Sequence, residues 1–293
     1  MNVAAGIVTY NPSLQRLEEN IEAISPQVGE VLLYDNASSN VEDVKRLVEE
    51  GTWEVPISII CGQKNAGLAV ALNNLCDEAR TRGMEFILLL DQDTVVEQDL
   101  VTKLVGLADG SIGIVAPLFQ DRNEVVERRA AERFEDVKRA ITSGSLLRLD
   151  VWERVGGYDE NLFIDWVDYE FCDRLLLNGY RIVRNNDASI LHELGNKEFV
   201  KVGWTFSPTK GLRKEPIYRN DRPYSRRYDR IKGESYTTAK YRGTFIWRLE
   251  AYMLVCNVLY DLVRERRRLE LVRAAFCGYV DGNKLVHAAK RRR

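Results

Sequence analysis

The chain has 293 residues, of which 45% are hydrophobic and 29% are charged, and its formal net charge is −2. The length is sufficient for a large hydrophobic core, and the composition is that of a globular protein rather than a disordered one. No apolar run is long enough to span a bilayer; Phe86–Leu90, for example, has only five residues.

The charge is unevenly distributed along the chain. Residues 1–193 contain 18 Lys and Arg against 34 Asp and Glu, whereas residues 194–293 contain 24 against 10. An acidic body with a basic C-terminal third indicates that one face meets an anionic surface or ligand. The alternative is two solvated surfaces that differ only in composition.

The cysteines are five in number, widely spaced and outside any C-x-x-C pair, which is typical of reduced thiols rather than a disulfide framework or a zinc site. The first residues, Asn2 to Tyr10, have the pattern of a strand and lack the basic start of a signal peptide. We therefore expect a cytoplasmic protein whose contact with a membrane, if it has one, is peripheral.

Short apolar runs alternate with amphipathic segments through the first part of the chain. The predicted strands are 3–9, 31–34, 57–61 and 86–90, and the predicted helices between them are 14–24, 41–50 and 67–82. This alternation predicts an α/β fold with a mostly parallel sheet flanked by helices. Ligands of such sheets bind beyond the carboxyl ends of the strands, so the polar residues after each run are the candidates for a site.

The pattern changes after Gly195. Residues 195–234 are basic, aromatic and contain Pro and Gly, and we expect a long loop there. Apolar residues at helical spacing then predict one helix over residues 244–268 and a second over 269–286. The sequence thus predicts a C-terminal helical extension.

The strongest local signal is Asp91-Gln92-Asp93, directly after the apolar strand 86–90. Two carboxylates at positions i and i+2 of an extended chain face the same way, so they can share a divalent cation and a diphosphate. The plainer interpretation is an acidic strand end.

A second segment, Asn65 to Asn73, has Gly67 and small Ala residues at a helix start, where free amides favour phosphate or ribose oxygens. The alternative is a polar cap whose small residues pack on the sheet.

A third segment, Gly156 to Arg174, contains four acids between Asp165 and Asp173 beside aromatic residues. A carboxylate next to an apolar wall can act as a general base if it reaches an acceptor hydroxyl. The alternative is an acidic helix start that stabilises its own dipole. His192 is one of two histidines in the chain, and it is either structural or a further metal ligand.

In this order, the motifs resemble those of glycosyltransferase family 2, which has the GT-A fold, and look most like its bacterial rhamnosyltransferase branch. The resemblance covers about residues 1–195 and continues weakly in 276–282. The matching segments are Thr9–Pro12, Tyr34–Ser38, Asn65–Asn73, Asp91–Thr94, Thr142–Ser145, Phe163–Phe171 and His192–Gly195. It implies a catalytic GT-A domain over residues 1–195, and an acceptor-side loop with basic amphipathic helices over residues 196–293.

The resemblance also implies roles for single residues. Asp93 would be the principal ligand of a divalent metal, Mg²⁺ or Mn²⁺, together with Asp91 and His192. Asp168 would be the general base, and because Val167 stands where the family has a Glu, either Asp165 or Glu170 is a candidate to share that role. The nucleotide-sugar would be bound by Thr9, Tyr10, Asn11, Asp35, Asn65, Gly67, Asp91 and Gln92. The acceptor side would include Asp165, Trp166, Glu170 and Lys240.

These residues together predict an inverting, metal-dependent transfer of a sugar from a nucleotide-sugar to a hydroxyl of a cell-envelope polysaccharide or lipid-linked glycan. L-Rhamnose from dTDP-rhamnose is the first candidate, and a UDP-sugar such as one of galactofuranose or glucose is the second. A non-catalytic nucleotide-sugar or glycan-binding module is the third. The excess of acidic residues in the first two thirds of the chain argues against nucleic acid as a partner. An association into homo-oligomers, and contact of the basic end with an anionic membrane, are both compatible with the sequence.

Overall fold

The computed structural model describes residues 2–121, 132–192, 197–207, 211–220, 223–264 and 267–291. The chain divides into two compact units. The first, the sheet unit, consists of Met1–Phe163 and Val167–Glu193; the second, the helical unit, consists of Ile164–Trp166 and Leu194–Arg293.

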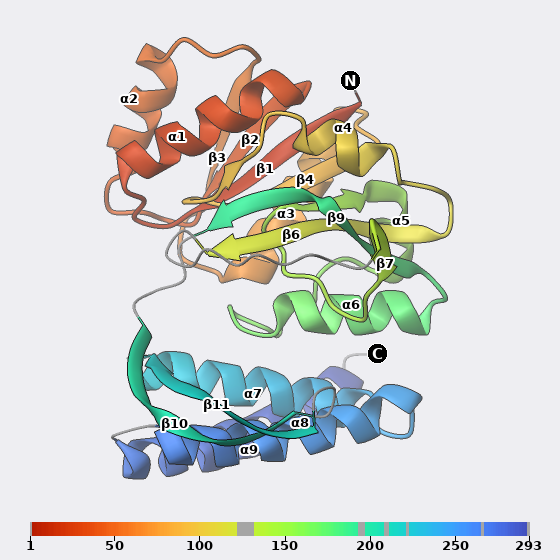
Figure 1. The fold of residues 1–293 in the computed structure, drawn as a ribbon. Coiled ribbons are helices and arrows are strands. Elements are labelled where there is room, and N and C mark those ends of the chain that lie inside the picture. The colour runs from red at the N-terminus through yellow and green to blue at the C-terminus, as the bar shows by residue number, and fades with distance from the viewer. Residues whose placement is uncertain are drawn as a thin grey trace. The chain divides into compact units, whose positions relative to one another are not determined.

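The sheet unit alternates strands and helices, as the sequence predicts, and each predicted boundary up to residue 91 differs from the observed one by at most one residue (Figure 1). Its elements are β1 Val3–Thr9, α1 Leu14–Ile24, a 3-10 turn Ser25–Gln27, β2 Glu30–Asp35, α2 Val41–Glu50, β3 Ile57–Cys61, α3 Leu68–Thr81, β4 Phe86–Asp91, β5 Val95–Val96, α4 Leu100–Val105, β6 Ile112–Asp121, β7 Phe134–Asp136, β8 Ser145–Arg148, α5 Leu149–Val155, α6 Val167–Leu177 and β9 Arg181–His192.

The strand order of the main sheet, within the described residues, is β3-β2-β1-β4-β8-β6-β9-β5, with β7 paired to β9. The half formed by β3, β2, β1 and β4 is parallel throughout. In the other half, β8 runs antiparallel to β4 and β6, while β6 and β9 are parallel. The parallel half brings the carboxyl ends of β1, β2 and β4 to one edge.

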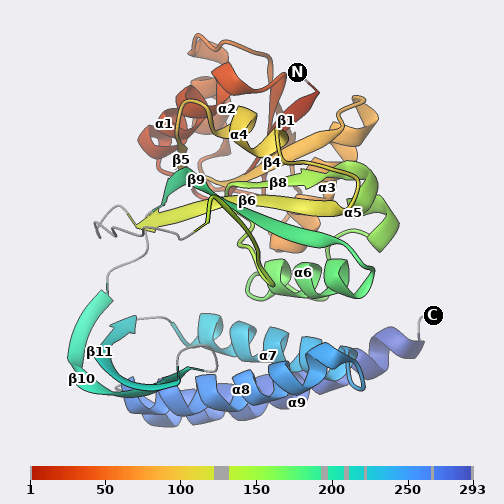
Figure 2. The same cartoon turned by 45° about the vertical axis from the view of Figure 1, so that its right-hand side comes forward.

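Helices cover both faces of the sheet: α1, α2 and α4 lie on one face, and α3, α5 and α6 on the other (Figure 2). The strands alternate accordingly. Ala5, Leu33 and Leu88 belong to the apolar cluster that also contains residues of α1 and α4, whereas their chain neighbours Leu32 and Ile87 are buried outside that cluster. A sheet buried on both faces explains why its strands are almost continuously apolar.

The helical unit consists of the antiparallel strands β10 Lys197–Ser207 and β11 Gly211–Asn220, followed by α7 Tyr224–Lys240, α8 Phe245–Arg264 and α9 Arg268–Arg291. The prediction of one long loop over residues 195–234 is therefore wrong. Much of this segment is a two-stranded ribbon, and α7 begins at Tyr224. The α7 helix was missed because it buries polar residues such as Arg227, Glu234 and Thr237, which hides the apolar period.

Helices α7 and α9 approach each other closely at two glycines of α9. A Cβ atom at Gly282 would lie 2.5 Å from the Lys232 carbonyl oxygen, and one at Gly278 would lie 3.0 Å from that of Tyr228. The predicted helices 244–268 and 269–286 correspond to α8 and α9. Within the described part of the chain, no helix combines the length and the apolar character needed to cross a bilayer.

Candidate functional site

Three strand ends meet at the carboxyl edge of the parallel half of the sheet. Thr9 of β1 pairs in register with Asp35 of β2, and Val8 pairs with Asp91 of β4. The polar segments that follow these strands are therefore neighbours in space, although they lie about 25 to 80 residues apart in sequence. This is the edge at which a ligand of such a sheet is expected.

The Asp35 carboxylate is the centre of a buried hydrogen-bond group. Asp35 is only 1% exposed. Its Oδ2 accepts from Thr9 Oγ1 at 3.0 Å and from Ser38 Oγ at 2.5 Å, and its Oδ1 accepts from the Ser38 backbone N–H at 2.8 Å. A carboxylate has about four acceptor positions, so these three bonds leave one. Thr9, which is fully buried, holds Asp35 rather than facing the edge.

Tyr10 and Asn11 form the loop after β1. Tyr10 is 49% exposed, and its backbone N–H donates to Gln92 Oε1 at 2.8 Å. The Asn11 N–H donates to Ser38 Oγ at 2.8 Å, and Asn11 Oδ1 accepts from the N–H and hydroxyl of Ser39. The loop is thus tied to the ends of both neighbouring strands, and it presents the Tyr10 ring to solvent.

The turn between β3 and α3 is fixed by two asparagine side chains. Asn65 Oδ1 accepts from Asn36 Nδ2 at 3.0 Å and from the Gly67 N–H at 3.1 Å, while Asn36 Oδ1 accepts from the Ala66 N–H at 3.0 Å. Gly67 has φ +95°, and a Cβ there would lie 2.5 Å from the Phe163 carbonyl oxygen. A glycine is required, and it brings this turn against Phe163.

Asp91 and Asp93 lie at and just beyond the end of β4, and both are half-buried. The Asp91 N–H donates to Ser143 Oγ at 3.1 Å, and the Asp91 carbonyl accepts from Asn20 Nδ2 at 2.7 Å. Ser143 also hydrogen bonds to Thr94 Oγ1 at 2.7 Å. The backbone that presents the two carboxylates is therefore held from two other elements.

Asn20 and Ser143 were given no role by the sequence reasoning. Asn20 is fully buried within the apolar face of α1, next to Leu17, Ile21 and Ile24. A buried amide needs a partner, so a polar residue at an apolar position of the helix was the signal that could have found it.

His192 is the last residue of β9, and its side chain lies outside what the structure describes. Its backbone position is clear. Val95 of β5 pairs in register with Leu191 of β9 in an antiparallel ladder. Val95 lies two positions after Asp93, and His192 directly follows Leu191. The histidine backbone thus reaches the segment that carries the carboxylates.

A divalent cation suits these donor types, because carboxylate oxygens are the preferred ligands of Mg²⁺ and Mn²⁺ and imidazole suits transition metals. Where side chains are described, no three His, Cys, Asp or Glu residues gather into a metal-binding group. Asp91 and Asp93 are two of the donors predicted from the sequence, and His192 is the predicted third.

The segment around Asp168 begins helix α6. Asp168 lies in the first turn, half-buried, and its Oδ1 accepts from the Tyr169 N–H at 2.8 Å. Trp166, two residues earlier, is 8% exposed and has φ +75°. Among the described residues, the other non-glycine residues with positive φ are Asn11 and Ala37, which follow β1 and β2. Such strain concentrates at functional sites.

The remaining acids of this segment are held in different ways. Glu170 is fully buried, and its carboxylate pairs with Arg174 at 2.7 Å. Asp165, in the helical unit, pairs with Arg226 of α7 at 3.0 Å. Lys240, at the end of α7, lies over the rings of Tyr236 and Tyr241.

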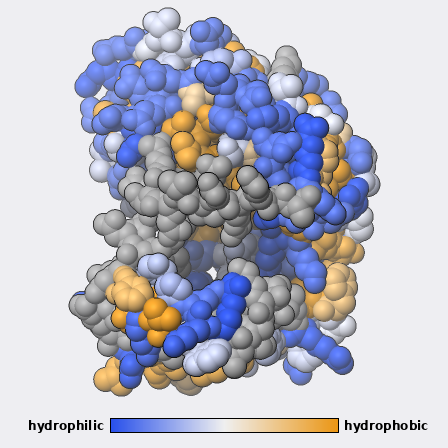
Figure 3. Space-filling view, viewed as in Figure 1, coloured by the Kyte–Doolittle hydropathy of each residue, from blue (hydrophilic) through white to orange (hydrophobic). Residues whose placement is uncertain are grey.

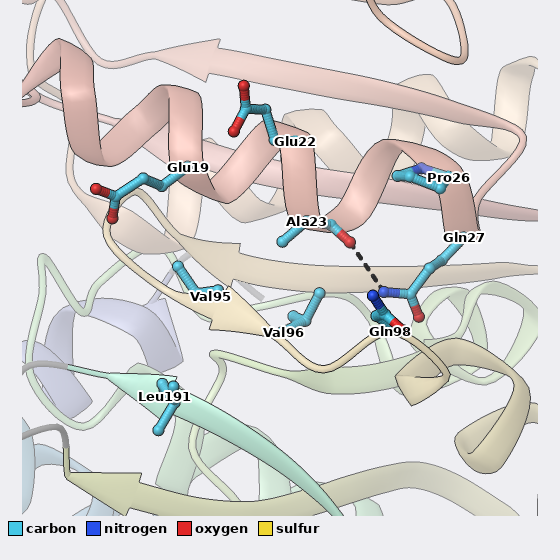
Figure 4. Close-up of a pocket in the computed structure, with 9 residues that line it drawn as sticks. All are labelled: Glu19, Glu22, Ala23, Pro26, Gln27, Val95, Val96, Gln98 and Leu191. Atoms are coloured by element: carbon cyan, nitrogen blue, oxygen red, sulfur yellow. Dashed lines mark hydrogen bonds between the residues drawn. The ribbon is translucent and has the colours of Figure 1, made fainter.

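A cavity of about 770 Å³ lies between α1 and strands β5 and β9 (Figure 4). It is lined mainly by apolar groups with two acids on α1, and Gln27 closes one end by donating to the Ala23 carbonyl at 2.9 Å. The residues predicted to bind the nucleotide-sugar are not part of its wall. The lining residues are Glu19, Glu22, Ala23, Pro26, Gln27, Val95, Val96, Gln98 and Leu191.

An α/β sheet that gathers acids, amides and a strained loop at the carboxyl ends of its parallel strands belongs to the class of proteins that bind nucleotide-type ligands at that edge. The family model described as "Glycosyl transferase family 2" matches residues 5–173, more than half of the chain. The chain therefore belongs to glycosyltransferase family 2.

Two relatives are similar in sequence. The dTDP-rhamnosyl transferase RfbF of Shigella flexneri is 31% identical over 214 residues, which cover 67% of this chain and 70% of the relative. A glucosyl-dolichyl phosphate glucuronosyltransferase of Haloferax volcanii is 24% identical over 228 residues, covering 66% and 70%. The family resemblance predicted from the motifs is thus confirmed.

Solved structures show the fold. S. aureus TarS aligns with a TM-score of 0.56 at 12% identity, over 91% of this chain and 44% of TarS, so the chain spans less than half of that protein. GalNAc-T7, solved with UDP, GalNAc and Mn²⁺, aligns with a TM-score of 0.55 at 12% identity, over 89% of this chain and 57% of the other. The fold is GT-A, as predicted.

Proposed function

We propose that this glycosyltransferase moves L-rhamnose from dTDP-rhamnose to a hydroxyl of a cell-envelope polysaccharide or lipid-linked glycan, with a divalent metal and with inversion. The observation that carries the proposal is the meeting of Asp35, Asp91 and Asp93 at one edge of the sheet. The 31% identity to a dTDP-rhamnosyl transferase supports rhamnose as the sugar.

The donor would lie across the ends of β1, β2 and β4. The Asp35 carboxylate has one acceptor position left for a pyrimidine N–H, and Thr9 and Ser38 keep that carboxylate oriented. The exposed Tyr10 ring would stack on the base, with Asn11 and Gln92 fixing its loop. The Asn65–Gly67 turn would border the ribose or the diphosphate, and its side-chain hydrogen bonds hold its backbone in place.

Asp93, Asp91 and His192 would hold Mg²⁺ or Mn²⁺, which supplies positive charge to the departing nucleoside diphosphate. Support for this assignment comes from the half-buried carboxylates at the end of β4 and from the β5–β9 register. The hydrogen bonds of Asn20 and Ser143 to the Asp91 backbone keep the carboxylates in place.

Asp168 would be the general base. It removes the proton of the acceptor hydroxyl while the oxygen forms a bond to the anomeric carbon from the face opposite the leaving group. The bond from that carbon to the diphosphate oxygen breaks, and its electron pair leaves with the nucleoside diphosphate. Residues 1–195 would bind the donor and carry the chemistry, and residues 196–293 would bind the acceptor, with Asp165, Trp166 and Lys240 on that side.

The test is release of nucleoside diphosphate from a panel of dTDP- and UDP-sugars, with Mn²⁺, Mg²⁺ or EDTA and a crude glycolipid extract as acceptor. We expect turnover of dTDP-rhamnose that EDTA abolishes. Turnover of a UDP-sugar alone would replace rhamnose by that sugar. Binding of a donor without turnover that is equal in wild type and Asp168→Asn would favour the binding-module alternative.

A further inference from the structure

Helix α8 turns an apolar stripe to solvent. Phe245 is 73% exposed, and Tyr252, Val255 and Leu259 are also exposed, at spacings of 7, 10 and 14 residues from Phe245. Residues at these spacings lie on one face of a helix. A surface of this kind normally has a partner.

The opposite face of α8 is polar and buried. Glu250 is 1% exposed, Asp261 pairs with Arg230 of α7, and Asn257 donates to Glu234 of α7 at 2.8 Å. Helix α8 therefore has the inverse of the usual arrangement, with charged groups inside and apolar groups outside. Asn257 and Asp261 contact α7 on this face, and the exposed apolar stripe lies on the other.

Helix α9 also exposes an apolar stripe, although its buried face, which includes Leu271 and Ala274, is apolar. The exposed apolar residues of α9 are Leu269 and, 3, 7 and 10 residues later, Val272, Phe276 and Tyr279. The exposed fractions of Leu269 and Phe276 are 87% and 70%. Gly278, on the opposite side, lies against α7. In the space-filling view, hydrophobic atoms lie along the lower edge, where Figure 1 draws the start of α9 (Figure 3).

The charges that border the stripes are mainly positive. The exposed charged residues of α8 and α9, where side chains are described, are the cations Arg248, Arg268, Arg273 and Lys284. The acids of α9 are half-buried and paired: Glu270 with Arg267 and Asp281 with Lys284. The outer faces of the two helices are thus apolar with a cationic border.

We propose that the outer faces of α8 and α9 dock this chain on a lipid bilayer rich in anionic phospholipid. The apolar stripes would enter the boundary between headgroups and acyl chains, and the cations would face lipid phosphates. A second copy of the chain is the weaker candidate, because it would bring like charges together around the apolar contact. The proposal concerns a partner of the helical unit and does not depend on which sugar is transferred.

The test is flotation of the full chain with vesicles of phosphatidylcholine alone or mixed with phosphatidylglycerol. We expect flotation with the anionic vesicles only, and less of it at high salt. Arg268→Gln with Arg273→Gln should weaken binding about 30-fold, at about 1 kcal/mol per cation near an anionic surface. Leu269→Ser with Phe276→Ser should abolish it.

Two variants in the sheet unit are matched controls that should bind as wild type: Arg46→Gln, an exposed cation, and Ile141→Ser, an exposed aliphatic residue. Unchanged far-UV circular dichroism of each variant excludes unfolding as the cause. Absence of flotation, equal flotation with neutral vesicles, or unchanged binding by the α9 variants would overturn the proposal. A dimer in sedimentation that Leu269→Ser with Phe276→Ser dissociates, without flotation, would assign the face to a second copy.

Discussion

The two units of the chain place their charges in opposite ways. In the sheet unit, the interior around Leu33 and Leu88 is apolar, and the acids Asp91 and Asp93 lie at the edge of the sheet. In the helical unit, Glu234, Glu250 and Asp261 are buried, while apolar residues such as Phe245 and Leu269 face solvent. Both arrangements occur in one chain whose net charge is close to zero.

The two arrangements indicate that the units are adapted to different surroundings. An apolar interior with acids at a strand edge is the arrangement of a water-soluble fold with a ligand site. An interior that buries charged groups beside apolar ones such as Ile231 and Leu271, with an apolar, cation-bordered exterior, is the arrangement of a surface that meets something other than water.

The largest effect is expected for Asp168→Asn, which removes the proposed base without changing the shape of the side chain. The rate of transfer should fall by about 10²–10⁴-fold, the usual contribution of general base catalysis, while binding of dTDP-rhamnose stays within about twofold of wild type. Steady-state release of nucleoside diphosphate measures the rate. Asp150→Asn, an acid on α5 outside the proposed site, is the control and should keep full activity.

The next effect is expected in the interior of the helical unit. Glu234→Ala removes the buried acceptor of Asn257 and the partner of Arg230, and it should cost about 3–5 kcal/mol of folding free energy because it leaves a buried cation without one of its acids. The matched control Glu42→Ala breaks the exposed pair with Lys45 and should cost less than about 1 kcal/mol. Urea titration measures both, and similar small costs for the two would contradict the contrast between the units.

Gly67→Ala should destabilise the sheet unit by about 3 kcal/mol, because the new Cβ meets the Phe163 carbonyl in a left-handed backbone. Gly83→Ala is the control: Gly83 has φ +78°, but no atom lies within 4 Å of a Cβ there, so strain alone should cost about 1–2 kcal/mol. Thermal unfolding compares the two variants. An equal shift in both would show that the turn does not rest against Phe163.

The smallest effect concerns alkaline pH. Burial raises the pKa of the Cys172 thiol from 9.0 to about 12. Between pH 9 and 12 the unfolded chain releases this proton and the folded chain keeps it. The contribution of the buried thiol to the free energy of unfolding is therefore fully present below pH 9, and it is lost as pH rises, by about 1 kcal/mol per pH unit. Cys172→Ala should therefore flatten the fall of thermal stability above pH 9. The exposed Cys61→Ala should follow the wild-type curve.

The sequence predicted the sheet unit well because local patterns decide it. Apolar runs mark the strands up to Asp91, and the rule that ligands bind at carboxyl ends was sufficient to select Asp35, Asp91 and Asp93 as neighbours. What it missed depends on contacts far apart in sequence. Asn20 holds Asp91 from 71 residues away, and no local pattern encodes such a contact.

The helical unit was predicted less well for a physical reason. Helix α7 buries Arg227 and Glu234, so its buried face does not read as apolar, and the ribbon of β10 and β11 is defined by pairing between strands rather than by either strand alone. The resemblance to the family places Glu170 on the acceptor side. Its buried ion pair with Arg174, one helical turn later, is a contact that the resemblance did not predict.

The proposed function requires that the carboxylates after β4 bind the donor together with a metal. The most direct test is calorimetric titration of dTDP-rhamnose with and without Mn²⁺ into wild type, Asp93→Ala and the control Asp99→Ala, an exposed acid six residues later that pairs with Lys103. We predict that Mn²⁺ tightens binding at least about tenfold in wild type and Asp99→Ala, and not in Asp93→Ala, since removing a ligand of a bound metal costs at least that much affinity. Metal-dependent binding that survives in Asp93→Ala would contradict the account.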